Sequence, residues 1–284
     1  MTAPRDQLAI LLAPLSPRLL DASTRGSGWN SVWLLTGNGK PVVLKIYGRR
    51  RTRLREWMTH LAQTLGGRTG YTAPDRQRTE RHGLRLWRKN GFDVPRIGCE
   101  PLPLPPLPAP FLLMEYLPGP SLAAFLADPA RTPGEKDALF LRFLSDWSRR
   151  HATALNLGEP ALLQEHPGLD HLLVSGARLV TFDLEVAYTS RRHMAEAVSA
   201  EIAGFVRSLF KVLPDLEARH FLRLLSDAYP DRTRLARVYT DLFDNPVLSH
   251  RLLHALDRRF LRKPGRLDKY LAAERLRDSL VAEK

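Results

Sequence analysis

The sequence predicts an α+β fold with two lobes, a small antiparallel-sheet N-lobe followed by a mainly helical C-lobe. In the first third of the chain, alternating apolar residues flank turn signals, which is the pattern of paired strands. A proline-rich stretch at residues 101–110 fits neither a helix nor a central strand. Beyond Ser121 the apolar residues follow a helical period, apart from two short strands. We therefore predict an N-lobe at residues 1–117 and a C-lobe at residues 118–284.

Composition argues against a disulfide-bonded secreted protein and against a membrane-spanning protein. The chain of 284 residues has a single cysteine, Cys99, which excludes an internal disulfide and a zinc site built from cysteines. Asp6 precedes the first apolar run and Pro14 and Pro17 interrupt it, which makes that run a poor secretory signal. No stretch approaches the roughly 20 apolar residues of a membrane span. We expect a cytoplasmic protein.

The chain is strongly basic. It has 43 Lys and Arg residues against 30 Asp and Glu residues, which gives a formal net charge of +13. This charge favours polyanionic partners, such as nucleic acid, anionic lipid headgroups or phosphorylated glycolipid. Two basic stretches, residues 45–56 and 258–270, could draw the protein to the periphery of the inner membrane. A solvated basic face gives the same pattern, so charge alone does not choose between these interpretations.

The strand-rich part begins with a hairpin. Residues 28–47 predict two strands around the turn Gly37–Gly39, because apolar residues alternate on both sides of residues that tolerate a positive φ. A polar and basic stretch follows at residues 49–78. Residues 79–90 predict a helix, which Gly91 ends.

Short elements surround the boundary between the lobes. The run at residues 101–110 predicts a polyproline-type surface loop, with an SH3-type ligand as the alternative. Residues 111–116 predict a short buried strand, and the turn 118–120 follows it. In the helical part, residues 172–174 and 179–182 predict two short strands joined by a tight turn.

The first candidate site would bind phosphate. Gly26, Gly28 and Ser31 precede a predicted strand, and glycines let backbone amides approach a phosphate with no Cβ in the way. Lys45 lies on an otherwise apolar strand, where a buried lysine needs an anion. The phosphates of a nucleotide would supply one. The alternative for Lys45 is an edge-strand lysine that faces water.

A buried lysine also needs a carboxylate to hold it. Glu80 on the predicted helix is the best candidate and Glu56 is its competitor, while a plain first-turn residue that stabilises the helix dipole is the alternative for Glu80. Glu115 and Leu117 lie where the strand 111–116 enters the connection between the lobes, and backbone groups there could bind the edge of an adenine.

An acidic residue ends the last predicted strand. Asp183 directly follows residues 179–182, and its oxygens suit a hard cation such as Mg²⁺. The alternative is a turn aspartate that faces solvent.

Taken in order, these features resemble the signature set of protein kinases: a glycine loop, a V-x-x-K strand, a helix glutamate, a hinge and an Asp-x-Glu/Gly metal motif. Among kinase-like proteins, the chain is most similar to the bacterial lipopolysaccharide-core (Kdo/heptose) kinase family. The similar features are the small size, the Asp-Leu-Glu form at Asp183–Glu185, the following helix at residues 201–211 and the form His-Leu-Leu-Val at His171–Val174. That family often has His at the first of these four positions in place of the usual Asn. The resemblance covers residues 26–211.

The resemblance implies a bilobal protein-kinase-like fold that uses ATP and Mg²⁺. It places Lys45 on the phosphates, Glu80 on Lys45 and Asp183 on the metal. The expected activity is transfer of a phosphoryl group to a hydroxyl of a sugar or glycolipid, such as the lipopolysaccharide core.

The catalytic loop departs from the kinase pattern H-x-D-x-x-x-x-N. If His171 takes the Asn position, His166 falls where the base belongs; if Asp170 takes it, the base position is Glu165. Neither register restores Asp. The second suits the chemistry better, because Asp170 could bind Mg²⁺ and Glu165 could accept a proton, whereas histidine suits Mg²⁺ poorly.

Two other functions stay open. A pseudokinase that binds nucleotide and acts as a binding module would tolerate a degraded catalytic loop. A nucleic-acid-binding protein is the least favoured, because the sequence has no stacking-aromatic motif or recognition helix beside its charge.

Overall fold

The structure, a computed structural model, describes residues 4–22, 30–37, 40–48, 53–98, 104–243 and 268–281. It divides into two compact units. Unit 1 contains Met1–Pro118 together with Val180–Thr189, and unit 2 contains Gly119–Leu179 together with Ser190–Lys284. The predicted α+β class is confirmed, since an antiparallel sheet and a separate helical part share the chain.

Several predictions fall outside the described residues. These are the glycine loop at Gly26 and Gly28, the lone Cys99, the start of the proline run, and most of the basic tail at residues 258–270. In the described part, no helix is long and apolar enough to cross a membrane.

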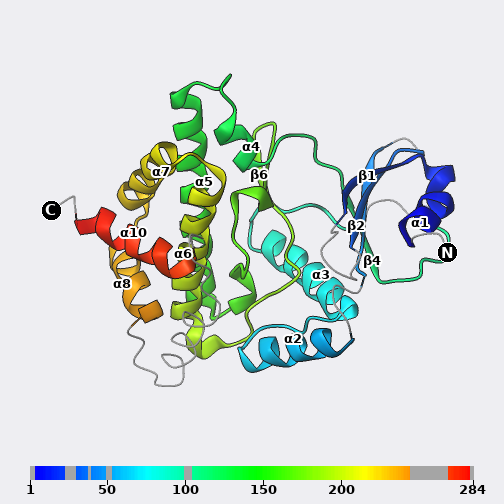
Figure 1. Ribbon diagram of the computed structural model, residues 1–284, viewed down its shortest axis with the longest axis horizontal. Coiled ribbons are helices and arrows are strands. Elements are labelled where there is room, and N and C mark those ends of the chain that lie inside the picture. The colour runs from blue at the N-terminus through cyan, green and yellow to red at the C-terminus, as the bar shows by residue number, and fades with distance from the viewer. Residues whose placement is uncertain are drawn as a thin grey trace. The chain divides into compact units, whose positions relative to one another are not determined.

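Unit 1 is built on a four-stranded antiparallel sheet of order β1-β2-β3-β4 (Figure 1). Its elements are α1 (Pro4–Leu12), η1 (Ala13–Leu15), β1 (Pro17–Ala22), β2 (Ser31–Leu35), β3 (Val42–Ile46), α2 (Arg53–Leu65), α3 (Ala73–Lys89) and β4 (Phe111–Glu115). The predicted hairpin is confirmed as β2 and β3, and the predicted strand at residues 111–116 is β4. The sequence did not predict α1, β1 or α2.

The pleat of β3 separates the apolar core from the charged site. Val42, Leu44 and Ile46 belong to a buried cluster with α1 residues such as Leu8. Because side chains alternate along a strand, Lys45 projects from the opposite face of the sheet. Figure 1 shows α1 on one side of the sheet and α3 on the other. The alternation that packs α1 therefore turns Lys45 toward α3.

Helix α3 begins six residues earlier than the prediction at residues 79–90. Thr72 is its N-cap, and the Thr72 hydroxyl accepts a hydrogen bond from the Asp75 amide at 3.3 Å. Pro74 in the first turn lacks the amide hydrogen that would otherwise be unsatisfied there. This start signal lies within residues 49–78, whose composition predicts only a polar and basic stretch. The helix ends close to the predicted stop, and Gly91 follows it with a φ of 75°.

Unit 2 is mainly helical, as the helical period beyond Ser121 predicts. Its elements are α4 (Leu122–Ala127), α5 (Pro133–Leu157), η2 (Pro160–Leu162), η3 (Leu169–His171), β5 (Leu172–Ser175), β6 (Arg178–Thr181), η4 (Arg191–His193), α6 (Met194–Val212), α7 (Asp215–Ala228), α8 (Arg232–Phe243) and α10 (Lys269–Val281). The two predicted short strands are β5 and β6, and Val180 and Thr181 at the end of β6 are counted with unit 1. Aromatic residues of α5, α6 and α7 pack against one another in its core: Phe140, Phe143, Trp147, Phe205 and Phe221.

Candidate functional site

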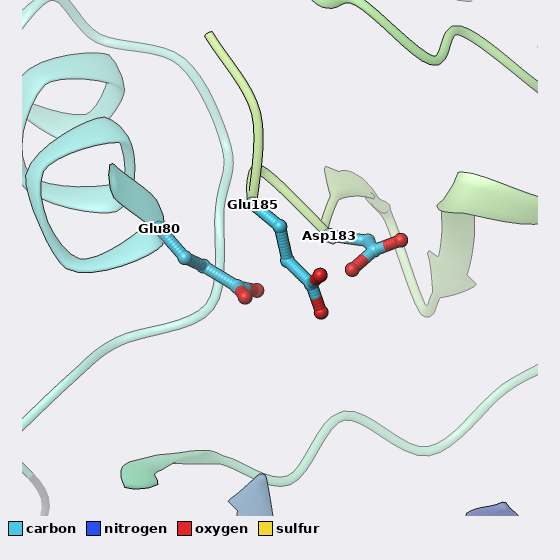
Figure 2. Close-up of side chains that lie close together, drawn as sticks. All are labelled: Glu80, Asp183 and Glu185. Atoms are coloured by element: carbon cyan, nitrogen blue, oxygen red, sulfur yellow. The ribbon is translucent and has the colours of Figure 1, made fainter. Parts of the chain in front are cut away.

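A buried cluster of charged side chains lies in unit 1, where β3, α3 and the segment after β6 meet. Lys45 Nζ is 2.6 Å from Glu80 Oε2, 2.6 Å from Asp183 Oδ1 and 2.9 Å from Glu185 Oε1. Figure 2 shows Glu80 on its helix and the carboxyl groups of all three acids turned toward one another. One ammonium group therefore joins three segments that are far apart in the sequence.

Lys45 keeps its charge despite its burial. Its side chain lies on an inner strand of the sheet and is only 8% exposed, so the alternative of an edge-strand lysine facing water is wrong. Burial by itself lowers the pKa of Lys45, but the nearby Asp183, Glu185 and Glu80 carboxylates outweigh it and hold that pKa above its ordinary value. Lys45 is therefore an ammonium ion at any physiological pH.

Glu80 is the carboxylate that pairs with Lys45 from a helix. Among the described residues, the carboxylates within ion-pair distance of Lys45 do not include Glu56, which lies in the first turn of α2. Glu80 lies in the middle of α3, so the alternative of a first-turn residue is wrong. Its Oε2 also accepts a hydrogen bond of 2.6 Å from the Tyr47 hydroxyl.

The surroundings of Glu80 favour its protonated form. Burial raises the pKa of Glu80 to about 7 against the opposing effect of Lys45, and the charges of Asp183 and Glu185 add to the rise. Among the described residues, the cluster contains these three carboxylates and two cations, Lys45 and Arg76.

Arg76 forms a second layer behind the cluster. Its fully buried guanidinium contacts Glu185 Oε2 at 3.0 Å, and it donates hydrogen bonds to Asn30 Oδ1 at 3.1 Å and to the Gly48 carbonyl oxygen. Asn30 donates in turn to Glu185 Oε1 at 3.4 Å and accepts from the Gly48 amide at 3.1 Å. Arg76 and Asn30 thus fix Glu185 and join the start of β2 to the end of β3.

Sequence reasoning missed most of this second layer. Arg76 precedes Glu80 by four residues, so the two share a helix face, but only if α3 starts at Ala73. Tyr47 follows Lys45 by two residues and therefore shares its face of the strand. The sequence motif named Glu185 without giving it a role. Nothing in the sequence points to Asn30.

Asp183 has an unusual backbone. Its φ of 65° lies in the left-handed region, which aspartate enters more readily than most residues. Its side chain is 29% exposed, against 1% for Glu80 and 4% for Glu185. The alternative of a solvent-facing turn aspartate is wrong, because Oδ1 pairs with Lys45. Asp183 is therefore the acid of the cluster that is most accessible to solvent.

The donor set fits a hard cation. One oxygen from each of the Glu80, Asp183 and Glu185 carboxylates lies within 4.8 Å of the others. Carboxylate oxygens are ligands that Mg²⁺ accepts, and it commonly takes one or two from protein and the rest from water and phosphate. Since Lys45 already contacts all three acids, the more exposed Asp183 is the best placed to take an ion.

The other residues expected to bind the nucleotide, Ser31, Glu115 and Leu117, lie outside the Lys45 cluster. Ser31 is fully buried at the start of β2, and its hydroxyl accepts a hydrogen bond from the Trp33 indole N–H at 2.9 Å. Glu115 ends β4, and its amide donates to the Arg96 carbonyl oxygen at 2.8 Å. Leu117 is buried in the segment that follows.

The catalytic-loop candidates lie in unit 2, in a single turn before β5. The candidate bases contact each other, Glu165 Oε2 with His166 Nδ1. His171 Nδ1 lies 2.7 Å from the His166 carbonyl oxygen, and Asp170 is exposed in η3. Because that carbonyl engages one ring nitrogen of His171, Asp170 is the more accessible of the two metal candidates.

Helix α6 holds this loop at both ends. The buried Glu201 carboxylate accepts the Gln164 amide hydrogen at 2.8 Å, and the Ser208 hydroxyl accepts the Leu169 amide hydrogen at 2.8 Å. Between them, a Cβ on Gly204 would lie only 2.8 Å from Pro167 Cγ, so glycine is needed for the close approach. Contacts with α6 therefore fix the backbone of this loop.

Protein-family models and curated proteins give no match to this chain.

Proposed function

We propose that the protein is an ATP-dependent phosphotransferase that acts on an alcohol group, with its nucleotide phosphates at Lys45. The observation that carries the proposal is the buried ion pair between Lys45 on β3 and Glu80 on α3, with Asp183 as a second partner of the same ammonium. Kinase-type phosphoryl transfer uses a strand lysine held by a helix glutamate beside a metal-binding aspartate. The proposal includes a bilobal protein-kinase-like fold of the lipopolysaccharide-core kinase type. The antiparallel sheet of unit 1 and the helices of unit 2 support it.

Each residue of the cluster has a role in this proposal. Lys45 binds the phosphates as a cation of fixed charge. Glu80 restrains the ammonium, and the Tyr47 hydroxyl restrains Glu80. Arg76 neutralises Glu185, which limits the negative charge that an incoming phosphate meets. Mg²⁺ would be held by Asp183, with Asp170 as the second candidate, and would neutralise phosphate charge when bound.

The acceptor is proposed to be a hydroxyl of a sugar or glycolipid such as the lipopolysaccharide core. Glu165 is the preferred base, because a carboxylate there leaves Asp170 for the metal. We predict that Glu165→Gln lowers phosphotransfer to such an acceptor by at least tenfold, while His166→Ala lowers it less. Radiolabelled ATP measures this ranking, and the reverse order would favour the register with His166 as base.

A pseudokinase is the second candidate function, and the catalytic loop favours it. In either register the base position holds Glu165 or His166 in place of the aspartate that kinases use. Such a protein would bind nucleotide and act by its shape. Binding of ATP without turnover on any sugar or glycolipid acceptor would identify it.

The nucleotide site is tested by direct binding. We expect Lys45→Ala to weaken Mg²⁺–ATP binding by at least tenfold, and the exposed Lys40→Ala to leave it unchanged. Equal affinities of both variants and the wild type would remove the basis of the proposal. A nucleic-acid-binding protein, the least favoured function, would instead bind DNA or RNA with steep salt dependence and would not bind ATP.

A further inference from the structure

Helix α2 exposes an apolar stripe. Five large apolar side chains of this helix are between 42% and 80% exposed: Leu54, Trp57, Met58, Leu61 and Leu65. Their spacing of three, four, seven and eleven residues from the first places them on one face of the helix. An exposed contiguous apolar patch on a protein surface commonly marks an interaction site.

The same helix turns its polar side inward. His60 Nδ1 accepts the Tyr71 amide hydrogen at 3.2 Å and lies 3.4 Å from Asp75. The side-chain oxygen of Gln63 is buried. A surface helix of a globular protein ordinarily does the reverse and buries its apolar face. The apolar stripe of α2 is therefore not used by the described residues to build the core of unit 1.

The sequence at the start of α2 is rich in arginine. The sequence has arginine at positions 49, 50, 51, 53 and 55, with Glu56 as the single acid between positions 49 and 65. Helices that lie in a membrane interface have this composition, with tryptophan and leucine on one face and arginine beside it.

We propose that α2 docks this protein on an anionic bilayer surface. The apolar stripe enters the boundary between headgroups and acyl chains, and the arginines meet the anionic headgroups. A second copy of the chain is the alternative occupant, and the measurements below distinguish it from a bilayer. The proposal is independent of ATP binding and goes beyond the proposed catalytic function.

Sedimentation of the full chain with vesicles tests the docking. Vesicles of phosphatidylcholine with phosphatidylglycerol should bind the wild type at least tenfold more tightly than vesicles of phosphatidylcholine alone. Trp57→Gln with Leu61→Gln should lose at least tenfold in affinity for the anionic vesicles. The matched control is Leu157→Gln with Leu216→Gln, which removes two exposed leucines of unit 2 and should change nothing. Circular dichroism checks that both variants are folded.

A second measurement uses Trp57 as a probe. Brominated lipid should quench tryptophan fluorescence in the wild type, and Trp57→Phe should remove that quenching although four other tryptophans remain. Arg53→Gln with Arg55→Gln should reduce both the quenching and the binding. Equal sedimentation of wild type and the Trp57/Leu61 variant would overturn the proposal. So would equal binding to neutral and anionic vesicles. A dimer in lipid-free solution that the Trp57/Leu61 variant abolishes would assign the stripe to a second copy instead.

Discussion

Replacing Lys45 with methionine should destabilise unit 1 in a pH-dependent way. The substitution keeps the volume of the aliphatic stem but removes the charge that contacts Glu80, Asp183 and Glu185. Among the described residues, Arg76, which contacts Glu185, would then be the remaining cation of the cluster. Removing one partner of a buried ion pair costs about 3–5 kcal/mol.

The pH dependence follows from the carboxylates. In the wild type, burial raises the pKa of Glu80 from 4.5 to about 7. A carboxyl group whose pKa is raised on folding stabilises the folded state. This contribution is complete when the pH is below the pKa of the unfolded state, and it is lost as the pH rises through the pKa of the folded state. Without Lys45 the folded pKa moves higher still, so the loss continues above neutral pH. From about pH 7 to about pH 9, the extra cost is at most about 2.7 kcal/mol, since one proton contributes about 1.4 kcal/mol per pH unit.

Urea unfolding followed by circular dichroism measures both quantities. Lys40→Met is the matched control, because Lys40 is exposed and its loss should cost less than about 0.5 kcal/mol. The account expects Lys45→Met to cost several times more than the control, and more at about pH 9 than at about pH 7. Equal costs for the two variants, or a cost that is independent of pH, would refute the reasoning.

Two further predictions concern unit 2. Glu201→Gln should cost about 3–5 kcal/mol in thermal unfolding, because it leaves the buried guanidinium of Arg150 without its carboxylate partner; a cost below about 1 kcal/mol would contradict this. Gly204→Ala should cost about 1–3 kcal/mol, because the new Cβ would lie 2.8 Å from Pro167 Cγ. Gly134→Ala is its control in the same assay, since a Cβ there meets nothing within 4 Å. Equal effects of the two substitutions would show that the loop at Pro167 moves to make room for the new Cβ.

The sequence could predict the centre of the site because each residue there breaks a simple pattern. Lys45 interrupts an apolar strand, and Asp183 ends one. Glu80 was chosen as a helix carboxylate at a suitable distance, and the structure brings all three together. Their contacts were predictable, whereas a nucleotide or metal between them stays a prediction.

The second layer depends on tertiary structure that no local pattern reveals. Arg76 is an arginine among many in a basic stretch, and only the true start of α3 gives it the same face as Glu80. Asn30 acts through contacts to residues as distant in sequence as Glu185. Helix α2 was not predicted for a related reason. Its sequence is rich in arginine, and this composition masks the helical period of its apolar residues.

The fold was predictable where turns and periodicity are strong. The hairpin β2–β3, strand β4 and the small sheet β5–β6 all follow from alternating apolar residues and turn signals. Strand β1 was not predicted. It pairs antiparallel with β2, and its register shifts between Leu19 and Asp21. Consecutive leucines and a bulge break the alternation on which such a prediction depends.

The most direct test of the central claim is calorimetric titration of ATP with and without Mg²⁺, on the wild type and on Asp183→Ala. The account predicts binding to the wild type that Mg²⁺ strengthens, and loss of that Mg²⁺ dependence in the variant, because Asp183 is the acid of the cluster placed to take the ion. Absence of ATP binding to the folded wild type would contradict the account, and would leave the Lys45 cluster as a purely structural ion network.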